Sequence, residues 1–65
     1  MGSRIRAIRE SHGLSQEEMA MKAGLDRAYY GRVERGEANV ASLNLLKIAE
    51  TLSVEVGDFF PGHRD

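Results

Sequence analysis

Hydrophobic residues in this chain recur every three or four positions, as they do along one face of an amphipathic helix, and no segment alternates as a strand would. Glycine and cap-forming residues divide the pattern into short segments. We predict helices over about residues 3–12, 15–23, 27–35, 42–52 and 55–60. With brief connections, these segments predict an all-α, compact five-helix bundle. Sixty-five residues make one domain, 1–65, with a core over about 2–60 and a frayed tail at 61–65.

The second and third predicted helices meet at a short turn that contains glycine. Ser15 and Glu18 have the S-x-x-E spacing of a capping box, which starts a helix. Gly24 follows as a left-handed stop, and Asp26 is suited to cap the next helix. Two short helices joined in this way form a helix-turn-helix, whose second helix can enter a DNA major groove. A tight corner in any small helical bundle shows similar spacing, so the motif alone leaves both interpretations open.

The same spacing predicts which helix faces are buried. In the helix over 27–35, Tyr30 and Val33 fall on the inner side, and a buried Tyr30 requires a partner for its hydroxyl group. The helix over 42–52 carries a wide apolar stripe, which consists of Leu45, Leu46, Ile48, Ala49 and Leu52. We therefore expect each of these helices to turn one side toward the core.

Charge is divided unevenly along the chain. The formal net charge is −1, without the excess of basic residues that many nucleic-acid-binding proteins show. Residues 1–36 nevertheless carry seven basic groups against five acidic ones, whereas residues 37–65 carry two basic groups against five acidic ones. The field at a docking face matters more than the total, so this separation orients the molecule toward DNA while giving modest non-specific affinity.

The composition excludes several classes of protein. There is no cysteine, hence no disulfide framework and no thiolate metal site, in agreement with a cytoplasmic location. No apolar run approaches the about 18 residues of a membrane span, and no signal peptide precedes the first amphipathic segment. We expect a soluble protein without a membrane partner.

An enzyme is not indicated. His12 and His63 are isolated and belong to no cluster with metal-ligand spacing. Ser11 beside His12 is not interpreted as a catalytic dyad, because neighbouring residues on a helix point in different directions. There is also no phosphate-binding loop. The sequence therefore predicts no catalysis, no metal and no cofactor.

The outward side of the helix over 27–35 is the candidate binding face. It carries three arginines and two small residues, namely Arg27, Ala28, Gly31, Arg32 and Arg35. Arginine can bond to both O6 and N7 of guanine, and an alanine methyl group can contact a thymine methyl group. The alternative is an ordinary solvated face. Gly31 either lets the helix approach bases or phosphate closely or occupies a tolerant position, since glycine there costs about 1 kcal/mol relative to alanine.

Three stretches, IRAIRESHGLSQEEMA, KAGLDRAYYGRVERGEAN and LLKIAETLSVEVGDFF, follow one another in the order typical of a known family. From about Gly2 to Phe60 the chain resembles the XRE family, the lambda-repressor-like helix-turn-helix domains. It is also similar to the controller proteins of restriction–modification systems, chiefly through LDRAYYGRVERGEAN and the closing FF. The resemblance implies a five-helix DNA-binding domain of a transcriptional regulator.

The resemblance assigns roles to individual residues. It implies base-reading positions at Arg27, Ala28 and Arg32, a phosphate contact at Gln16, and a partly buried ion pair between Arg9 and Glu34. Further backbone contacts are expected from Tyr29, Arg35 and Asn39, although Asn39 is equally suited to a turn or a cap.

The chain departs from the family pattern around the helix over 42–52. Val40 and Ala41 stand where Pro and then Ser or Thr are usual, so Ser42 or Asn39 is left to cap this helix. Ser53 stands where a glycine normally ends it.

A second copy of the chain is the expected protein partner. Repressors of this kind bind near-palindromic operators as two-fold dimers. Three large apolar residues near the C-terminus, Val56, Phe59 and Phe60, are expected to form the homodimer surface; alternatively, one phenylalanine caps the core and the other is incidentally exposed. The leading function is sequence-specific binding of double-stranded DNA in transcription regulation. The alternatives are a protein-interaction module and the DNA-binding part of a larger sensor protein.

Overall fold

The computed structural model describes residues 1–60; the predicted frayed tail, 61–65, lies outside the described residues. The elements are α1 (Gly2–Ser11), α2 (Gln16–Ala23), α3 (Arg27–Glu34), α4 (Ser42–Leu52) and the 3₁₀ helix η1 (Val56–Phe59). Residues 1–60 contain no strand, which confirms the all-α class. The four α-helices lie within one residue of their predicted bounds.

The prediction of a fifth α-helix over 55–60 was wrong. The segment forms only one tight turn, in which the Asp58 amide donates to the Glu55 carbonyl at 2.9 Å and the Phe60 amide donates to the Gly57 carbonyl at 3.1 Å. These i→i+3 bonds define a 3₁₀ helix, a form that proteins use in short pieces. Phe60 precedes Pro61 in the sequence and has an extended backbone, with φ −111° and ψ 120°. Because a residue before proline disfavours the α conformation, the helix cannot lengthen at this end.

The turn between α2 and α3 forms as predicted. The Ser15 hydroxyl accepts from the Glu18 amide at 3.0 Å, while the Ser15 amide donates to the Glu18 carboxylate at 2.9 Å. Gly24 has φ 71°, the left-handed conformation that ends α2. The Asp26 carboxylate then accepts from the Tyr29 amide at 3.0 Å and caps α3. Local capping chemistry therefore fixes the start of both helices.

The two ends of α4 show the effect of the departures from the family pattern. Ala41 occupies the N-cap position, and no side chain caps the helix, so neither Ser42 nor Asn39 takes this role. At the other end, Ser53 adopts the left-handed conformation with φ 57°, a position in which a glycine carries no steric penalty. Of the non-glycine residues among 1–60, Ser53 alone has a positive φ.

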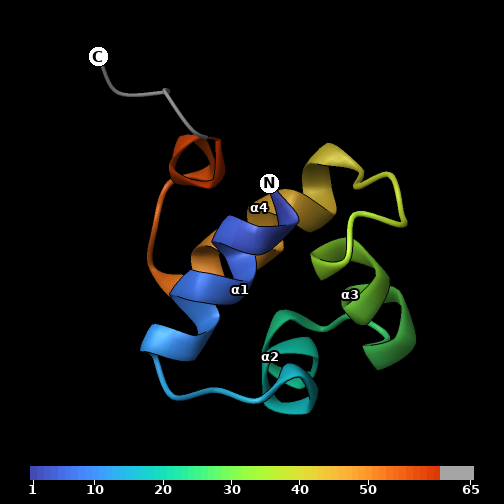
Figure 1. Ribbon diagram of the computed structural model, residues 1–65, viewed down its shortest axis with the longest axis horizontal. Helices are drawn as coiled ribbons and strands as arrows, with labels where there is room; N and C mark the ends of the chain where they lie inside the picture. Colours follow the sequence, from blue (N-terminus) through green and yellow to red (C-terminus); the bar gives the residue numbers. More distant parts are fainter. Residues whose placement is uncertain (61–65) are drawn as a thin grey trace.

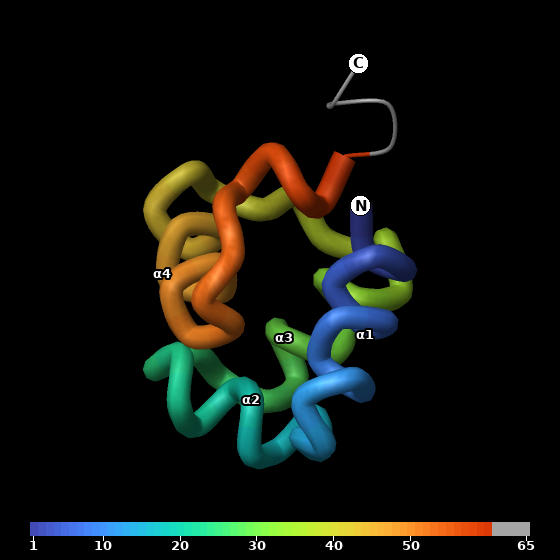
Figure 2. The backbone as a smooth tube through the Cα atoms, turned by 90° about the vertical axis from the view of Figure 1, so that its left-hand side faces the viewer, coloured from blue at the N-terminus to red at the C-terminus, as the bar shows by residue number. Residues whose placement is uncertain are grey.

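The core lies between α1 and α4, with α2 below them, η1 above and α3 behind α1 in the view of Figure 2. In Figure 1, α1 passes in front of α4, and α3 lies at the side of the molecule. The largest fully buried side chains are Tyr30, Phe59, Ile5, Met19, Ile48, Leu52 and Val33. The stripe predicted on α4 is narrower than expected, because Leu46 lies at its rim and is 45% exposed. No helix of residues 1–60 is long and apolar enough to span a membrane.

Candidate nucleic-acid interface

The outward face of α3 presents all three predicted arginines to solvent. Arg27, Ala28, Arg32 and Arg35 are all exposed. Within residues 1–60, neither Arg27 nor Arg32 forms an ion pair, whereas Nε of Arg35 lies 3.1 Å from Oε1 of Glu37. Two guanidinium groups are thus free to donate hydrogen bonds to an acceptor-rich surface. The bond between Arg35 and Glu37 was not predicted from the sequence.

Gly31 does not belong to this exposed face, contrary to the prediction. It is buried, and a Cβ atom built on it comes 3.2 Å from Nη1 of Arg35 and 3.5 Å from Oε1 of Gln16. These side chains come from the C-cap residue of α3 and from the start of α2, and they cover the glycine. Helical spacing does place Arg35, four residues on, beside Gly31, but it does not reveal the cover by Gln16, which comes from another helix.

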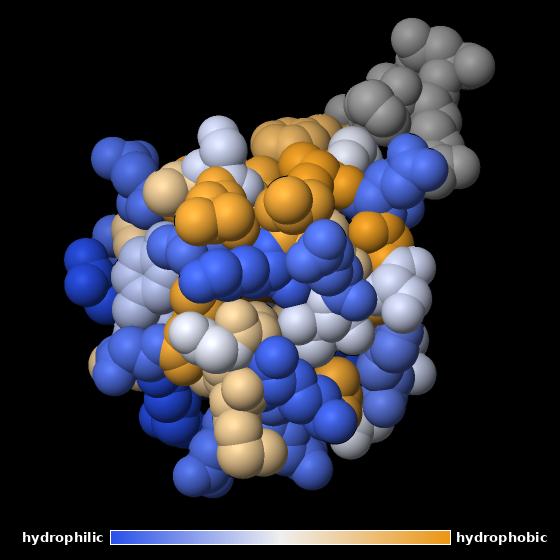
Figure 3. Space-filling view, turned by 180° about the vertical axis from the view of Figure 1, so that it is seen from behind, coloured by the Kyte–Doolittle hydropathy of each residue, from blue (hydrophilic) through white to orange (hydrophobic). Residues whose placement is uncertain are grey.

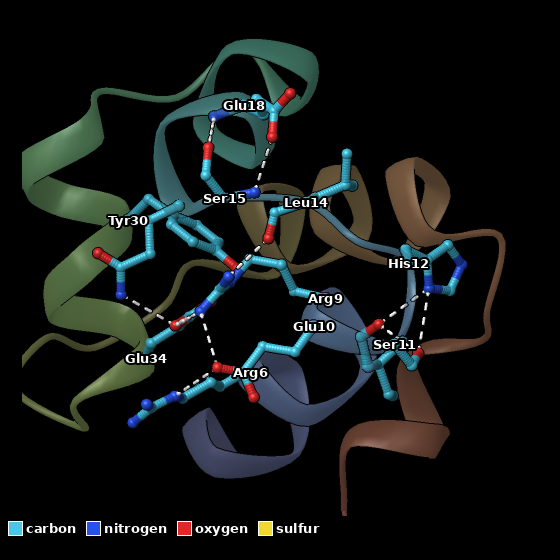
Figure 4. A network of polar contacts seen from close by, with 12 residues as sticks. Arg6, Arg9, Glu10, Ser11, His12, Leu14, Ser15, Glu18, Tyr30 and Glu34 are labelled. Carbon is cyan, nitrogen blue, oxygen red and sulfur yellow. Dashed lines mark hydrogen bonds and ion pairs between the residues drawn. The ribbon is translucent and has the colours of Figure 1, made fainter.

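A buried carboxylate holds α1, α2 and α3 together (Figure 4). Glu34 accepts from Nε of Arg9 at 2.7 Å and from Nη2 of Arg9 at 3.1 Å. It also accepts from the Tyr30 hydroxyl and, at 3.0 Å, from Nε2 of Gln16. Nη1 of Arg9 donates to the Leu14 carbonyl at 2.7 Å, so the loop before α2 joins the same network. The expected Arg9–Glu34 pair is present, and both residues are 7% exposed.

The network also explains the ionisation of its members. Burial raises the pKa of Glu34, but the hydrogen bonds from Arg9, Tyr30 and Gln16 outweigh this effect and hold the pKa below its usual range. Burial, together with the hydrogen bond to Glu34, raises the pKa of the Tyr30 hydroxyl well above normal. The hydroxyl therefore stays protonated and remains a donor. The predicted need of Tyr30 for a partner is met here, within one turn of its own helix.

Gln16 is bonded inside the domain and keeps a donor for a further contact. Its side chain is half-buried at the first position of α2, with the amide nitrogen bonded to Glu34. An amide nitrogen carries two hydrogens, so the second remains for another acceptor. The first turn of α2 also offers unpaired backbone N–H groups. The phosphate contact stays a prediction, and the bond to Glu34 was not predicted from the sequence.

The remaining predicted contacts flank α3. Tyr29 is half-buried, and its hydroxyl accepts from Nδ2 of Asn44 at 3.3 Å, a link to α4 that was not predicted. Asn39 is exposed in the loop between α3 and α4. Their contacts with the DNA backbone stay predictions.

The three apolar residues near the C-terminus, Val56, Phe59 and Phe60, do not all lie at the surface. Phe59 is fully buried, so it belongs to the core of this chain rather than to a surface for a partner. Phe60 is 43% exposed and Val56 is half-buried. Leu43 and Leu46 of α4, which packs against η1, are 63% and 45% exposed. Figure 3 shows hydrophobic side chains gathered at the end of the molecule where α4 begins and η1 lies.

Ser11 and His12 come closer together than expected. Oγ of Ser11 lies 3.4 Å from Nδ1 of His12, because His12 follows the last residue of α1 and its ring turns back toward the helix (Figure 4). Both groups, however, lie against the Ile8 carbonyl, at 2.6 Å for Ser11 and 2.8 Å for His12. Both side chains therefore provide partners for a backbone carbonyl at the C-terminal end of α1. The His12 ring is then not placed to act as a base for the Ser11 hydroxyl. No three His, Cys, Asp or Glu side chains of residues 1–60 are grouped to hold a metal ion.

A capped helix, a glycine turn and a second helix with free arginines on its outer face define a helix-turn-helix, the reading unit of a DNA-binding transcriptional regulator. The chain belongs to the helix-turn-helix family HTH_3, the XRE-type domains, whose model matches residues 5–59. This is a family of DNA-binding regulators rather than enzymes.

The relatives include controller proteins of restriction–modification systems. The chain is 38% identical over 60 residues to the control protein C.MunI of a Mycoplasma species, covering 91% of this chain and 81% of the relative. It is 40% identical over 58 residues to the control protein C.BamHI of Bacillus amyloliquefaciens, covering 88% and 72%. Its structure matches that of the restriction–modification controller protein C.AhdI from Aeromonas hydrophila with a TM-score of 0.88 and 49% identity, covering 91% and 89%.

Proposed function

We propose that the chain acts as a homodimer on a near-palindromic operator in double-stranded DNA, with α3 of each copy in the major groove. One observation carries this proposal: Arg27 and Arg32 are exposed and without an acidic partner on the outer side of a helix whose inner side is fixed by the Glu34 network. A rigid helix with free donors is suited to reading base edges, because specificity requires donors at fixed positions.

The proposed contacts fall into two groups. Arg27, Ala28 and Arg32 read bases, the arginines through guanine O6 and N7 and the alanine through a thymine methyl group. Gln16, Tyr29, Arg35 and Asn39 contact the DNA backbone and fix the register of α3. This division follows position: the readers stand on the outer side of α3, whereas the others lie beside it on α2, on α3 and in the following loop.

The proposed dimer surface is formed by α4 and η1. It contains Val56 and Phe60 as expected, together with Leu43 and Leu46, while Phe59 is left in the core. Large exposed apolar side chains on one end of a small domain are typical of a protein interface. A second copy of the chain covers this surface and sets the distance between two reading helices at about one turn of DNA.

The relatives named as controllers of restriction–modification systems support a role at a promoter. By analogy, we propose that the chain regulates transcription by occupying an operator there, without a cofactor. These relatives come from bacteria, in which the DNA lies in the cytoplasm, and we propose the same location. A protein-interaction module remains the rival function; it needs no free arginines at the reading positions.

A selection from randomised duplexes tests the proposal. The purified chain is mixed with the duplexes at low and at moderate salt, and the bound fraction is sequenced. We expect an inverted repeat whose half-sites lie about one helical turn apart, with binding that weakens steeply as salt rises. Enrichment of no sequence, with weak binding that salt does not change, would instead support a protein-interaction module.

A further inference from the structure

Two of the proposed backbone contacts converge on a single glycine. Gly31 lies beneath Arg35, whose Nη1 is 3.2 Å from the position that a Cβ atom would take, and beneath Gln16, whose Oε1 is 3.5 Å from that position. The first distance is tighter than most contacts that a Cβ atom makes in proteins. An alanine at this position therefore requires the Arg35 guanidinium to shift by a few tenths of an ångström.

Both covering side chains are held from their far sides. The amide nitrogen of Gln16 is bonded to Glu34 at 3.0 Å, which directs the amide oxygen away from Glu34 and leaves it near Gly31. Nε of Arg35 is bonded to Glu37 at 3.1 Å, and Nη1 of the same planar group reaches back over Gly31. The Arg35 side chain is still 54% exposed, so the guanidinium keeps donors for a ligand in solution.

We propose that Gly31 is a positioning residue: its missing side chain lets the Arg35 guanidinium lie beside the Gln16 amide, so that both contact one stretch of the DNA phosphate backbone. This inference rests on the proposed function. It accounts for a glycine inside a helix, where alanine favours folding. It also takes the place of the interpretation in which Gly31 itself approaches a base, because side chains of this chain already cover the glycine.

The experiment compares four proteins: the wild type, Gly31→Ala, Arg35→Ala and the double variant. Each is titrated onto the selected operator and onto a scrambled duplex of equal length, between 50 and 200 mM salt. Arg35→Ala is expected to weaken binding about tenfold on both duplexes, as for one lost bond to a charged group. Gly31→Ala is expected to weaken both by a smaller factor, about twofold to threefold, because the guanidinium shifts by only a few tenths of an ångström, and to lower the slope of log affinity against log salt by less than the about 0.9 of one lost phosphate contact. In the Arg35→Ala background, the added Gly31→Ala change should have no further effect.

Thermal unfolding separates positioning from a fold defect. Because only a flexible side chain must move, Gly31→Ala is expected to unfold at the same temperature as the wild type or higher. Three results would overturn the inference: a loss confined to the selected operator, which indicates approach to a base; a loss that persists without Arg35; or binding and salt slope unchanged from the wild type. If the wild type binds neither duplex, the proposed function itself fails, and the inference fails with it.

Discussion

Glu34 is the residue on which the reading unit depends most. Its carboxylate accepts bonds from Arg9 of α1, Gln16 of α2 and Tyr30 of α3. A buried ion pair adds little net stability when it is complete, but removal of one partner leaves a charge in a low dielectric. We therefore assign the cluster a role in fixing the relative positions of three helices rather than in raising stability.

Arg9→Met tests this assignment. The variant leaves the Glu34 carboxylate buried without its ion pair, so we expect the free energy of unfolding to fall by about 3–5 kcal/mol. Urea denaturation measures the change. Arg6→Met is the matched control on the same helix, because the Arg6 side chain is 64% exposed. A loss of similar size in both variants would contradict a special role for Arg9.

The network also predicts a dependence of stability on pH. The pKa of Glu34 is lowered in the folded protein, so its contribution is present above the ordinary value of 4.5 and is lost as pH falls through the folded pKa. The urea concentration at the midpoint of unfolding should therefore decrease for the wild type as pH is lowered below 4.5. For Glu34→Gln this decrease should be less steep. Glu18, whose pKa is lowered by the hydrogen bonds with Ser15, titrates in both proteins and cancels in the comparison. Equal slopes would contradict the prediction.

Ser53 offers a stabilising substitution. It ends α4 in the left-handed conformation, which costs a residue with a side chain about 1–2 kcal/mol, whereas glycine adopts it freely. We expect Ser53→Gly to raise the free energy of unfolding by about 0.5–1 kcal/mol, after allowance for the greater entropy of unfolded glycine. Thermal unfolding measures the effect. Glu50→Gly, at an exposed position inside α4, is the control and should destabilise.

At the level of elements, the sequence predicts helix bounds well, because capping is local. Ser15, Glu18, Gly24 and Asp26 lie within a few residues of the backbone groups that they serve. The fate of a side chain far from its partner is harder to predict. Gly31 is covered in part by Gln16 of α2, and Phe59 is buried although its neighbour Phe60 is exposed. Both depend on packing between elements, which helical periodicity does not describe.

The reading role of α3 predicts the effect of Arg32→Ala. Loss of one bidentate contact should weaken binding to the selected operator by about 1–3 kcal/mol and relax the preference at one base position. Binding to several operator variants, measured by fluorescence anisotropy, gives both quantities. Arg6→Ala removes the same charge from α1 and should change all duplexes alike and only slightly. An equal loss on every sequence would remove Arg32 from the base-reading residues.

For the whole molecule, the exposed apolar end predicts self-association. Phe60→Asp places a charge on the proposed dimer surface and should weaken the dimer at least tenfold without unfolding the chain, since Phe60 is 43% exposed. Sedimentation equilibrium measures the mass. Met21→Asp, at an exposed position on α2, should leave the mass unchanged. A Phe60→Asp protein that keeps the mass of the wild type would exclude Phe60 from the dimer.

The Glu34 network reaches three helices but not α4. Among the hydrogen bonds of residues 1–60, one side-chain bond, from Asn44 to Tyr29, joins α4 to the other α-helices; the remaining contact is apolar packing. Directional bonds therefore fix the reading unit, while the proposed dimer face rests on contacts that tolerate substitution. The consequence concerns the evolution of this chain. Substitutions in α4 can change the preferred partner while the operator sequence stays the same. Substitutions in α3 can change the operator while the partner stays the same.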